Sequence, residues 1–119
     1  MTPEPSAQPP AEPRVERRGA PRHAAPLRWL FHLLSPAGEL AAYAVLEDAS
    51  ASGLRLLVSA GCSMGPAVLE PRPPHPLAGR LFPVRIERVG TAQGLGVSVG
   101  GRFTPPITDD EARALAAVR

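Results

Sequence analysis

Apolar and polar side chains alternate along much of the chain between residues 27 and 103. The first such stretch, residues 27–33, places a large apolar side chain at every second position and polar residues at Arg28 and His32. This period of two is typical of a strand with one buried face. Apolar runs bounded by proline, glycine and serine predict five more strands, over residues 40–46, 54–58, 67–70, 81–89 and 94–103.

The period changes after the last predicted strand. Thr108 and Glu111 have the spacing of a capping box, in which each side chain accepts a hydrogen bond from a backbone amide at the start of a helix. An apolar stripe that begins at Ala112 continues to about Val118. Six short strands followed by one helix predict a mainly β fold: a small six-stranded antiparallel β-barrel with a C-terminal α-helix.

Composition divides the chain into three parts. Residues 1–13 contain five prolines and no large apolar side chain after Met1, which predicts a disordered, proline-rich tail. Residues 14–26 form a basic arm in which three nearby prolines disfavour a long helix. Residues 27–119 hold the predicted barrel and helix, and a chain of 119 residues has room for one domain.

Arginine supplies all thirteen basic residues, with a net charge of +2 and an isoelectric point of about 9.5. A chain rich in alanine, arginine and proline and without lysine is typical of GC-rich coding DNA, so the position of an arginine is more informative than its abundance. No apolar run approaches the roughly 18–20 residues of a membrane span, and the N-terminus lacks the pattern of a secretory signal. The single cysteine, Cys62, rules out an intramolecular disulfide. These features predict a cytoplasmic protein.

Two short motifs hint at enzyme chemistry but lack its context. Residues 61–65 match the Gly-x-Ser-x-Gly motif of serine hydrolases, which requires a following helix and a large parallel sheet. Residues 94–96 begin a dinucleotide-loop pattern whose third glycine comes one position late. The three histidines show no metal-ligand spacing with Cys62. The sequence therefore predicts no enzyme, no metal site and no cofactor.

The strongest candidate site combines two motifs. Arg18 and Arg22 form Arg-x-x-x-Arg on the arm, a pattern that arises by chance in so arginine-rich a chain. Asp48, Ser50 and Gly53 form Asp-x-Ser-x-x-Gly, for which chance supplies roughly 0.02 matches at this composition and length. The first motif precedes the first predicted strand, and the second lies where the second strand turns into the third.

This arrangement resembles the PilZ domain, a bacterial receptor for the second messenger cyclic di-GMP, over residues 16–118. That family carries both motifs on a six-stranded antiparallel barrel with a helix near its end. The resemblance implies that Arg18 and Arg22 clamp the ligand from the arm. It also implies that the second motif receives the ligand on the barrel. Arg17 precedes the first motif, and a basic residue there favours a stacked pair of ligand molecules in similar domains.

The residue types suit this ligand, which carries two phosphates and two guanines. Arginine pairs bidentately with phosphate oxygens and with guanine O6 and N7. Asp48 can accept hydrogen bonds from the guanine N–H edge, Ser50 offers a hydroxyl, and Gly53 permits close approach. We therefore expect a cyclic di-GMP receptor whose arm closes on the ligand through a hinge near residues 19–26 and so changes binding to a protein partner.

Two alternatives stay open at this level. A degenerate PilZ-like adaptor would keep the barrel, serve motility or pilus proteins and bind no nucleotide. A small basic module would bind nucleic acid through its arm, which the few aromatic residues and the lack of a continuous basic face disfavour.

Gly100 and Gly101 depart from the family pattern because they interrupt the last predicted strand before Phe103, so the register of that strand stays open.

Overall fold

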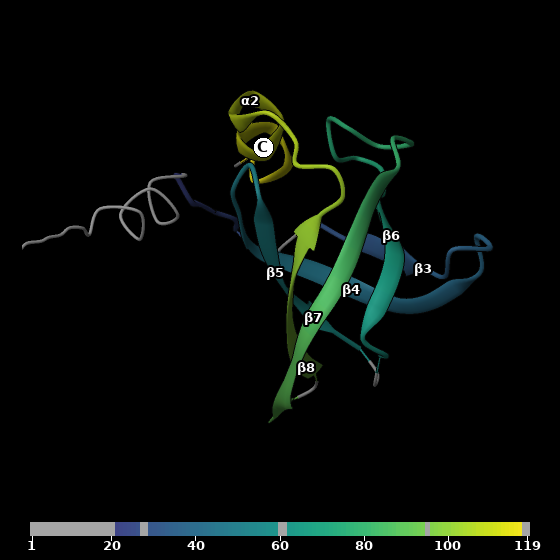
Figure 1. The fold of residues 1–119 in the computed structure, drawn as a ribbon. Helices are drawn as coiled ribbons and strands as arrows, with labels where there is room; N and C mark the ends of the chain where they lie inside the picture. The colour runs from purple at the N-terminus through teal and green to yellow at the C-terminus, as the bar shows by residue number, and fades with distance from the viewer. Residues whose placement is uncertain (1–20, 27–28, 60–61, 95, 118–119) are drawn as a thin grey trace, which may run out of the picture.

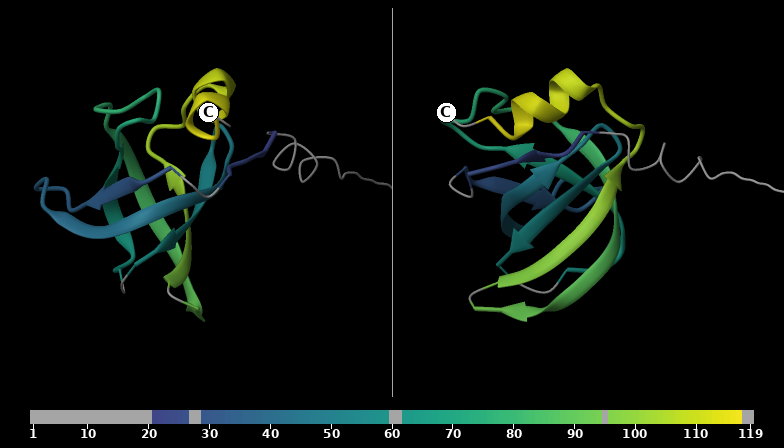
Figure 2. Two further views of the ribbon diagram at one scale, coloured as in Figure 1. Left: turned by 180° about the vertical axis from the view of Figure 1, so that it is seen from behind. Right: turned by 90° about the vertical axis from the view of Figure 1, so that its left-hand side faces the viewer.

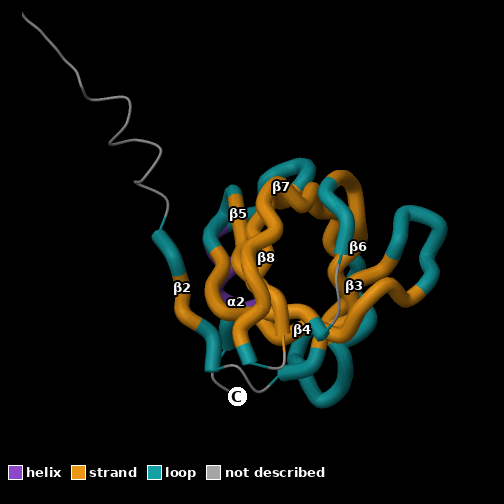
Figure 3. The backbone as a smooth tube through the Cα atoms, turned by 90° about the horizontal axis from the view of Figure 1, so that it is seen from below, coloured by secondary structure: helices purple, strands orange, loops and turns teal. Residues whose placement is uncertain are grey.

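The computed structural model describes residues 21–26, 29–59, 62–94 and 96–117, and its core is a closed antiparallel barrel of six strands (Figure 1). The ring order is β4–β3–β6–β7–β8–β5, and pairing between β4 and β5 closes it (Figure 3). The elements are β2 (His23–Ala24), β3 (Phe31–Leu34), β4 (Leu40–Ala49), β5 (Gly53–Val58), β6 (Gly65–Pro71), β7 (Phe82–Gln93), β8 (Gly96–Phe103) and α2 (Asp109–Leu115). The predicted fold class is confirmed, with β2 as an additional strand outside the ring.

Inward-facing side chains of the strands fill the barrel. Phe31, Leu56 and Phe103 are at most 1% exposed. The rings of Phe82 and Phe103 meet edge to face with their centroids 6.3 Å apart, an arrangement that aromatic quadrupoles favour. Helix α2 lies across one end of the barrel in both views of Figure 2 and buries Leu115 there. Within the described ranges, no helix is long and apolar enough to cross a membrane.

Several element boundaries differ from the sequence prediction; β7, for example, continues to Gln93 and does not end at residue 89. The first strand begins at Phe31 rather than at residue 27, because Trp29 turns toward the C-terminal end, where its indole Nε1 donates to the Ala117 carbonyl at 2.6 Å. The second strand continues to Ala49, so Asp48 lies on β4 and not in a turn. Residues of the arm form the extra strand β2.

Bulges explain why the simple alternation of apolar and polar residues fails along β4 and β7. The register with the neighbouring strand shifts between Leu46 and Asp48 on β4 and between Ile86 and Arg88 on β7. Each bulge inserts one residue, and side chains after it point to the opposite face from the one that simple alternation assigns. A period of two therefore breaks at residue 47 although the strand continues.

Strand β8 is continuous despite its two adjacent glycines. Its register with β5 runs without a shift from Arg102 opposite Gly53 to Val97 opposite Val58. A Cβ on Gly101 would lie 2.2 Å from the Arg85 carbonyl oxygen on β7. Glycine at this position thus permits the close approach of β7 at its bulge, and the open question about the last strand is answered.

His75 anchors the proline-rich connector between β6 and β7 to the helix. Its Nδ1 accepts a hydrogen bond from the Leu77 backbone N–H at 2.9 Å, so the ring proton lies on Nε2, which donates to the Leu115 carbonyl at 2.9 Å. The imidazole is 3% exposed and meets the rings of Trp29 and Phe31 edge to face. This histidine therefore has a structural role at the junction of barrel and helix.

Helix α2 begins with the capping box that the sequence predicts. Thr108 Oγ1 accepts from the Glu111 backbone N–H at 3.0 Å, and the Glu111 carboxylate accepts from the Thr108 backbone N–H at 2.9 Å. Arg80 donates to the other oxygen of the same carboxylate at 2.8 Å. The hydrogen bond from the Thr108 backbone, followed by that from Arg80, lowers the pKa of Glu111.

We expect the capping box to stabilise the folded state near neutral pH and to lose this effect in acid. A carboxyl whose pKa is lowered by folding stabilises the fold above its ordinary pKa of 4.5 and loses this contribution as the pH falls through the lowered value. Glu111→Gln should therefore reduce the difference between the unfolding free energies measured by urea titration at about pH 7 and about pH 3. Glu39→Gln, in an exposed turn, serves as the control, and an unchanged difference in Glu111→Gln would contradict the expectation.

Candidate functional site

The basic arm reaches the barrel as strand β2. It runs antiparallel to the end of β4, with Ala24 opposite Asp48. Beyond the strand, the Ala25 backbone N–H donates to the Glu47 carbonyl at 3.0 Å. Since β5 occupies one edge of β4 here, β2 lies on the other edge, in line with β3, and it stands outside the ring in Figure 3. The arm therefore lies directly beside the second motif.

Arg22 and Asp48 form an ion pair across β2 and β4. The Arg22 guanidinium donates to the Asp48 carboxylate, and Arg55 Nε lies 4.0 Å from the other carboxylate oxygen. Half of the Arg22 side chain remains exposed. An exposed pair of this kind contributes only about 0–1 kcal/mol to folding, so its main consequence is position. It holds a guanidinium, several of whose donors have no partner among the described residues, over the outer surface of the barrel.

Ser50 and Gly53 form the turn between β4 and β5. The Ser50 N–H donates to the Gly53 carbonyl at 2.8 Å, and the Gly53 N–H donates to Ser50 Oγ at 3.1 Å. Ser50 is 1% exposed, and a Cβ on Gly53 would lie 3.0 Å from the Gly101 carbonyl. Serine thus closes the turn and glycine lets β5 approach β8. The ligand contacts of these two residues stay predictions.

The structure brings together part of the predicted site. It places Arg22 and Asp48 in contact and sets Ser50 and Gly53 in the adjoining turn. Arg17 and Arg18, the tail of residues 1–13 and the arm up to residue 20 lie outside the described residues. The two motifs therefore meet through Arg22.

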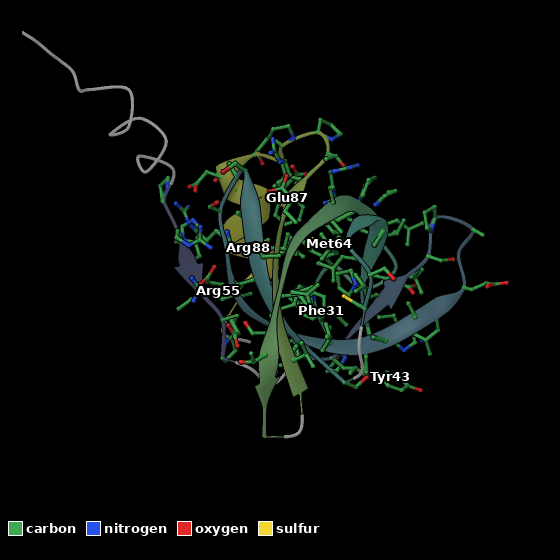
Figure 4. The ribbon with its side chains drawn as sticks, turned by 60° about the horizontal axis from the view of Figure 1, so that its bottom comes forward. Phe31, Tyr43, Arg55, Met64, Glu87 and Arg88 are labelled. Atoms are coloured by element: carbon green, nitrogen blue, oxygen red, sulfur yellow. The ribbon has the colours of Figure 1, made fainter. Side chains whose placement is uncertain are left out.

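Three residues that sequence reasoning missed, Arg55, Gly100 and Arg88, form a row with Asp48 across the barrel. Asp48 on β4 is opposite Arg55 on β5, Arg55 is opposite Gly100 on β8, and Gly100 is opposite Arg88 on β7. Arg55 and Arg88 lie on the same side of the barrel in Figure 4. The row is continuous across four neighbouring strands on the outer surface of the barrel.

A second row lies beside the first on the same face. Gly53 on β5 is opposite Arg102 on β8, which is opposite Arg85 on β7. We call the two rows together with the arm residue the outer arginine face. It consists of Arg22, Asp48, Gly53, Arg55, Arg85, Arg88, Gly100 and Arg102.

The outer arginine face carries excess positive charge. Arg102 Nε donates to the Glu87 carboxylate at 2.6 Å, and Asp48 is already shared by two guanidinium groups. In the part of the chain that the structure describes, no carboxylate lies within 4.0 Å of the guanidinium of Arg85 or Arg88. The face therefore has the charge to attract an anionic ligand.

The other side of the arm contacts the helix. His23 Nε2 lies 2.8 Å from an Asp109 carboxylate oxygen, and Arg113 donates to the other oxygen at 3.0 Å. An open groove of about 660 Å³ separates β2 from α2 and is lined by Arg22, His23 and Arg113 among others. The arm is thus linked to β4 on one side and to the start of α2 on the other.

The segment with the serine-hydrolase motif has a different local structure. Gly65, with a φ of 114°, begins strand β6, so the described part of the motif leads into a strand and not into the helix that a nucleophile elbow requires. Burial raises the pKa of the Cys62 thiol, which reduces its reactive thiolate fraction. Among the described residues, no three His, Cys, Asp or Glu side chains are placed to hold a metal ion.

No protein-family model matches the chain, and no curated protein is similar to it in sequence.

Proposed function

We propose that this chain is a cyclic di-GMP receptor of the PilZ type, which binds its ligand between the arm and the outer surface of the barrel. One observation carries the proposal: β2 pairs with β4 so that Arg22 contacts Asp48, 26 positions later in the sequence. Two motifs that the resemblance connects to one ligand therefore share one surface.

The chemistry of this surface suits a guanine dinucleotide. Within the described part of the chain, Asp48 occupies only part of the Arg22 guanidinium, whose other donors suit a phosphate or the O6 and N7 edge of guanine. The Asp48 carboxylate accepts hydrogen bonds, as the N–H groups on the opposite edge of guanine require. Arg17 and Arg18 would add cations from the preceding part of the arm.

The docked strand lowers the cost of binding. Four or five charge-assisted hydrogen bonds supply on the order of 10 kcal/mol before ordering costs, and each newly ordered residue costs about 1–2 kcal/mol. Residues 23–25 are already hydrogen-bonded to β4, so the ligand does not have to order them. The hinge near residues 19–26 stays a prediction, since residues 19 and 20 lie outside the described part of the chain. A dissociation constant in the micromolar range, about −8 kcal/mol, is then within reach.

The contacts of the arm suggest how binding is transmitted. His23 links β2 to Asp109 in the first turn of α2. Arg22 also lines the groove between β2 and α2, so a change in the contacts of Arg22 on ligand binding would alter this groove. We propose that this groove, or the adjoining surface of α2, is what a protein partner senses.

Isothermal titration calorimetry of the full chain with cyclic di-GMP tests the proposal. We expect saturable micromolar binding that excess GTP or bulk RNA does not displace. Absence of binding would contradict a receptor and favour an adaptor that ignores the nucleotide. Displacement by RNA would favour a nucleic-acid module.

Amide hydrogen exchange tests the closure of the arm. We expect residues 14–22 to gain protection with saturating cyclic di-GMP, whereas the amides in the β2–β4 pairing are protected in both states. Equal protection of residues 14–22 with and without bound ligand would contradict the closure and leave the binding proposal intact.

A further inference from the structure

Two bulges turn charged residues to the same row of the barrel surface. Leu46 points into the core, and simple alternation would send Asp48 to the core as well. The bulge at residue 47 instead places Asp48 on the outside, opposite Arg55. The bulge after buried Ile86 places Arg88 on the outside in the same way, opposite Gly100.

Gly100 forms a floor for the Arg88 side chain. A Cβ on Gly100 would lie 2.6 Å from Arg88 Nη2 and 3.2 Å from Cζ, so the guanidinium rests on the glycine. Because Gly100 has no side chain, the Arg88 guanidinium lies over the middle of the row, between its own strand and Arg55. A cavity of about 430 Å³ opens there, lined by Arg55, Arg88, Ser98 and Gly100 among others.

The two ends of the row are too far apart for one phosphate. Neighbouring strands lie about 4.8 Å apart, so the backbones at Asp48 and Arg88, separated by three intervals, are about 14 Å apart along the sheet, and the Arg88 guanidinium over Gly100 is about 10 Å from β4. Asp48 already has two guanidinium neighbours, whereas Arg88 has no carboxylate partner among the described residues. An additional anionic group of the ligand would therefore gain the most binding free energy at the Arg88 end of the row.

We infer that Arg88 is a further ligand-binding residue, held over Gly100 to contact the guanylate unit of the ligand that lies farthest from the arm. The inference rests on the proposed function and extends its site from β4 across β5 and β8 to β7. A guanidinium can bind this guanylate unit through its phosphate or through its base, because it pairs with phosphate oxygens and guanine edges and stacks on aromatic rings. Arg22 and Asp48 hold one end of the ligand, and Arg88 holds the other.

Calorimetric titration of cyclic di-GMP into Arg88→Gln, Gly100→Ala and the double variant tests this role. Arg88→Gln should weaken binding about tenfold, the loss of one charge-assisted contact. Gly100→Ala should weaken binding several-fold because its methyl group displaces the guanidinium, and it should add little in the Arg88→Gln background, as expected for coupled residues. Arg72→Gln is the control: it removes an arginine just after β6, outside the outer arginine face, and should change the affinity less than about threefold.

The outcomes separate the two proposals. Wild-type binding with unchanged affinity in Arg88→Gln would overturn the role of Arg88 and leave the receptor intact. Equal losses in Arg88→Gln and Arg72→Gln would also overturn it, because the effect would then be one of overall charge. Absence of wild-type binding would overturn the receptor and this inference together. Thermal unfolding of each variant verifies that the barrel is folded.

Discussion

Replacing Arg22 with alanine should weaken cyclic di-GMP binding about a hundredfold while the barrel stays folded. Arg22 is the described residue of the first motif, and it lies beside Asp48 with half of its side chain exposed. Loss of two charge-assisted hydrogen bonds to the ligand costs about 3 kcal/mol, which corresponds to about a hundredfold in affinity. The ion pair itself is exposed and contributes at most about 1 kcal/mol to folding.

The matched control for this variant is Arg72→Ala. Arg72, just after strand β6, donates to Glu70 on that strand at 3.2 Å. Strand β6 is not a neighbour of β2 or β4 in the barrel. Calorimetric titration should give the wild-type affinity for Arg72→Ala, and urea titration should give nearly wild-type stability for Arg22→Ala. Equal affinities of Arg22→Ala and wild type would show that the contact with Asp48 has no part in binding.

Replacing Gly101 with alanine should destabilise the fold by about 2–4 kcal/mol, a large share of the 5–15 kcal/mol typical of a small domain. The new Cβ would lie 2.2 Å from the Arg85 carbonyl oxygen and 3.2 Å from the Ile86 Cα, and both are backbone atoms. Strands β7 and β8 would have to separate at the bulge, where their pairing already shifts. The free energy of unfolding from urea titration measures the effect.

The neighbouring glycine provides the control. In Gly100→Ala the Cβ meets only the flexible end of the Arg88 side chain, which can move at little cost. We therefore expect its stability to lie within about 1 kcal/mol of wild type. Similar unfolding free energies for the two variants would contradict the conclusion that close backbone approach requires glycine at position 101 but not at position 100.

Sequence reasoning succeeded where side-chain pattern and local hydrogen bonding coincide. The capping box at Thr108 and Glu111 involves neighbouring residues only, and the structure has both of its hydrogen bonds. The alternation along β7 likewise predicted the buried side of that strand as far as Ile86. In both cases the interactions depend on spacing within one element.

The same reasoning failed at the bulges and across the sheet. Asp48 was assigned to a turn because the apolar alternation stops at Leu46, whereas the strand continues through an inserted residue. The role of Gly100 was missed because its partners, Arg55 and Arg88, come from strands that only the barrel order brings to either side of it. A glycine pair within a strand was the one signal that pointed there.

The amino-acid pattern by itself determined the fold class, the helix start and the two motifs, because period, turn residues and capping act over a few neighbouring positions. Only the tertiary structure decided that the arm adds a strand to β4 and that Arg22 contacts Asp48. It also decided that the outer arginine face extends from there to β7. These features depend on strand order and on register. Register changes with a single inserted residue, and such an insertion leaves almost no trace in the composition of the strand.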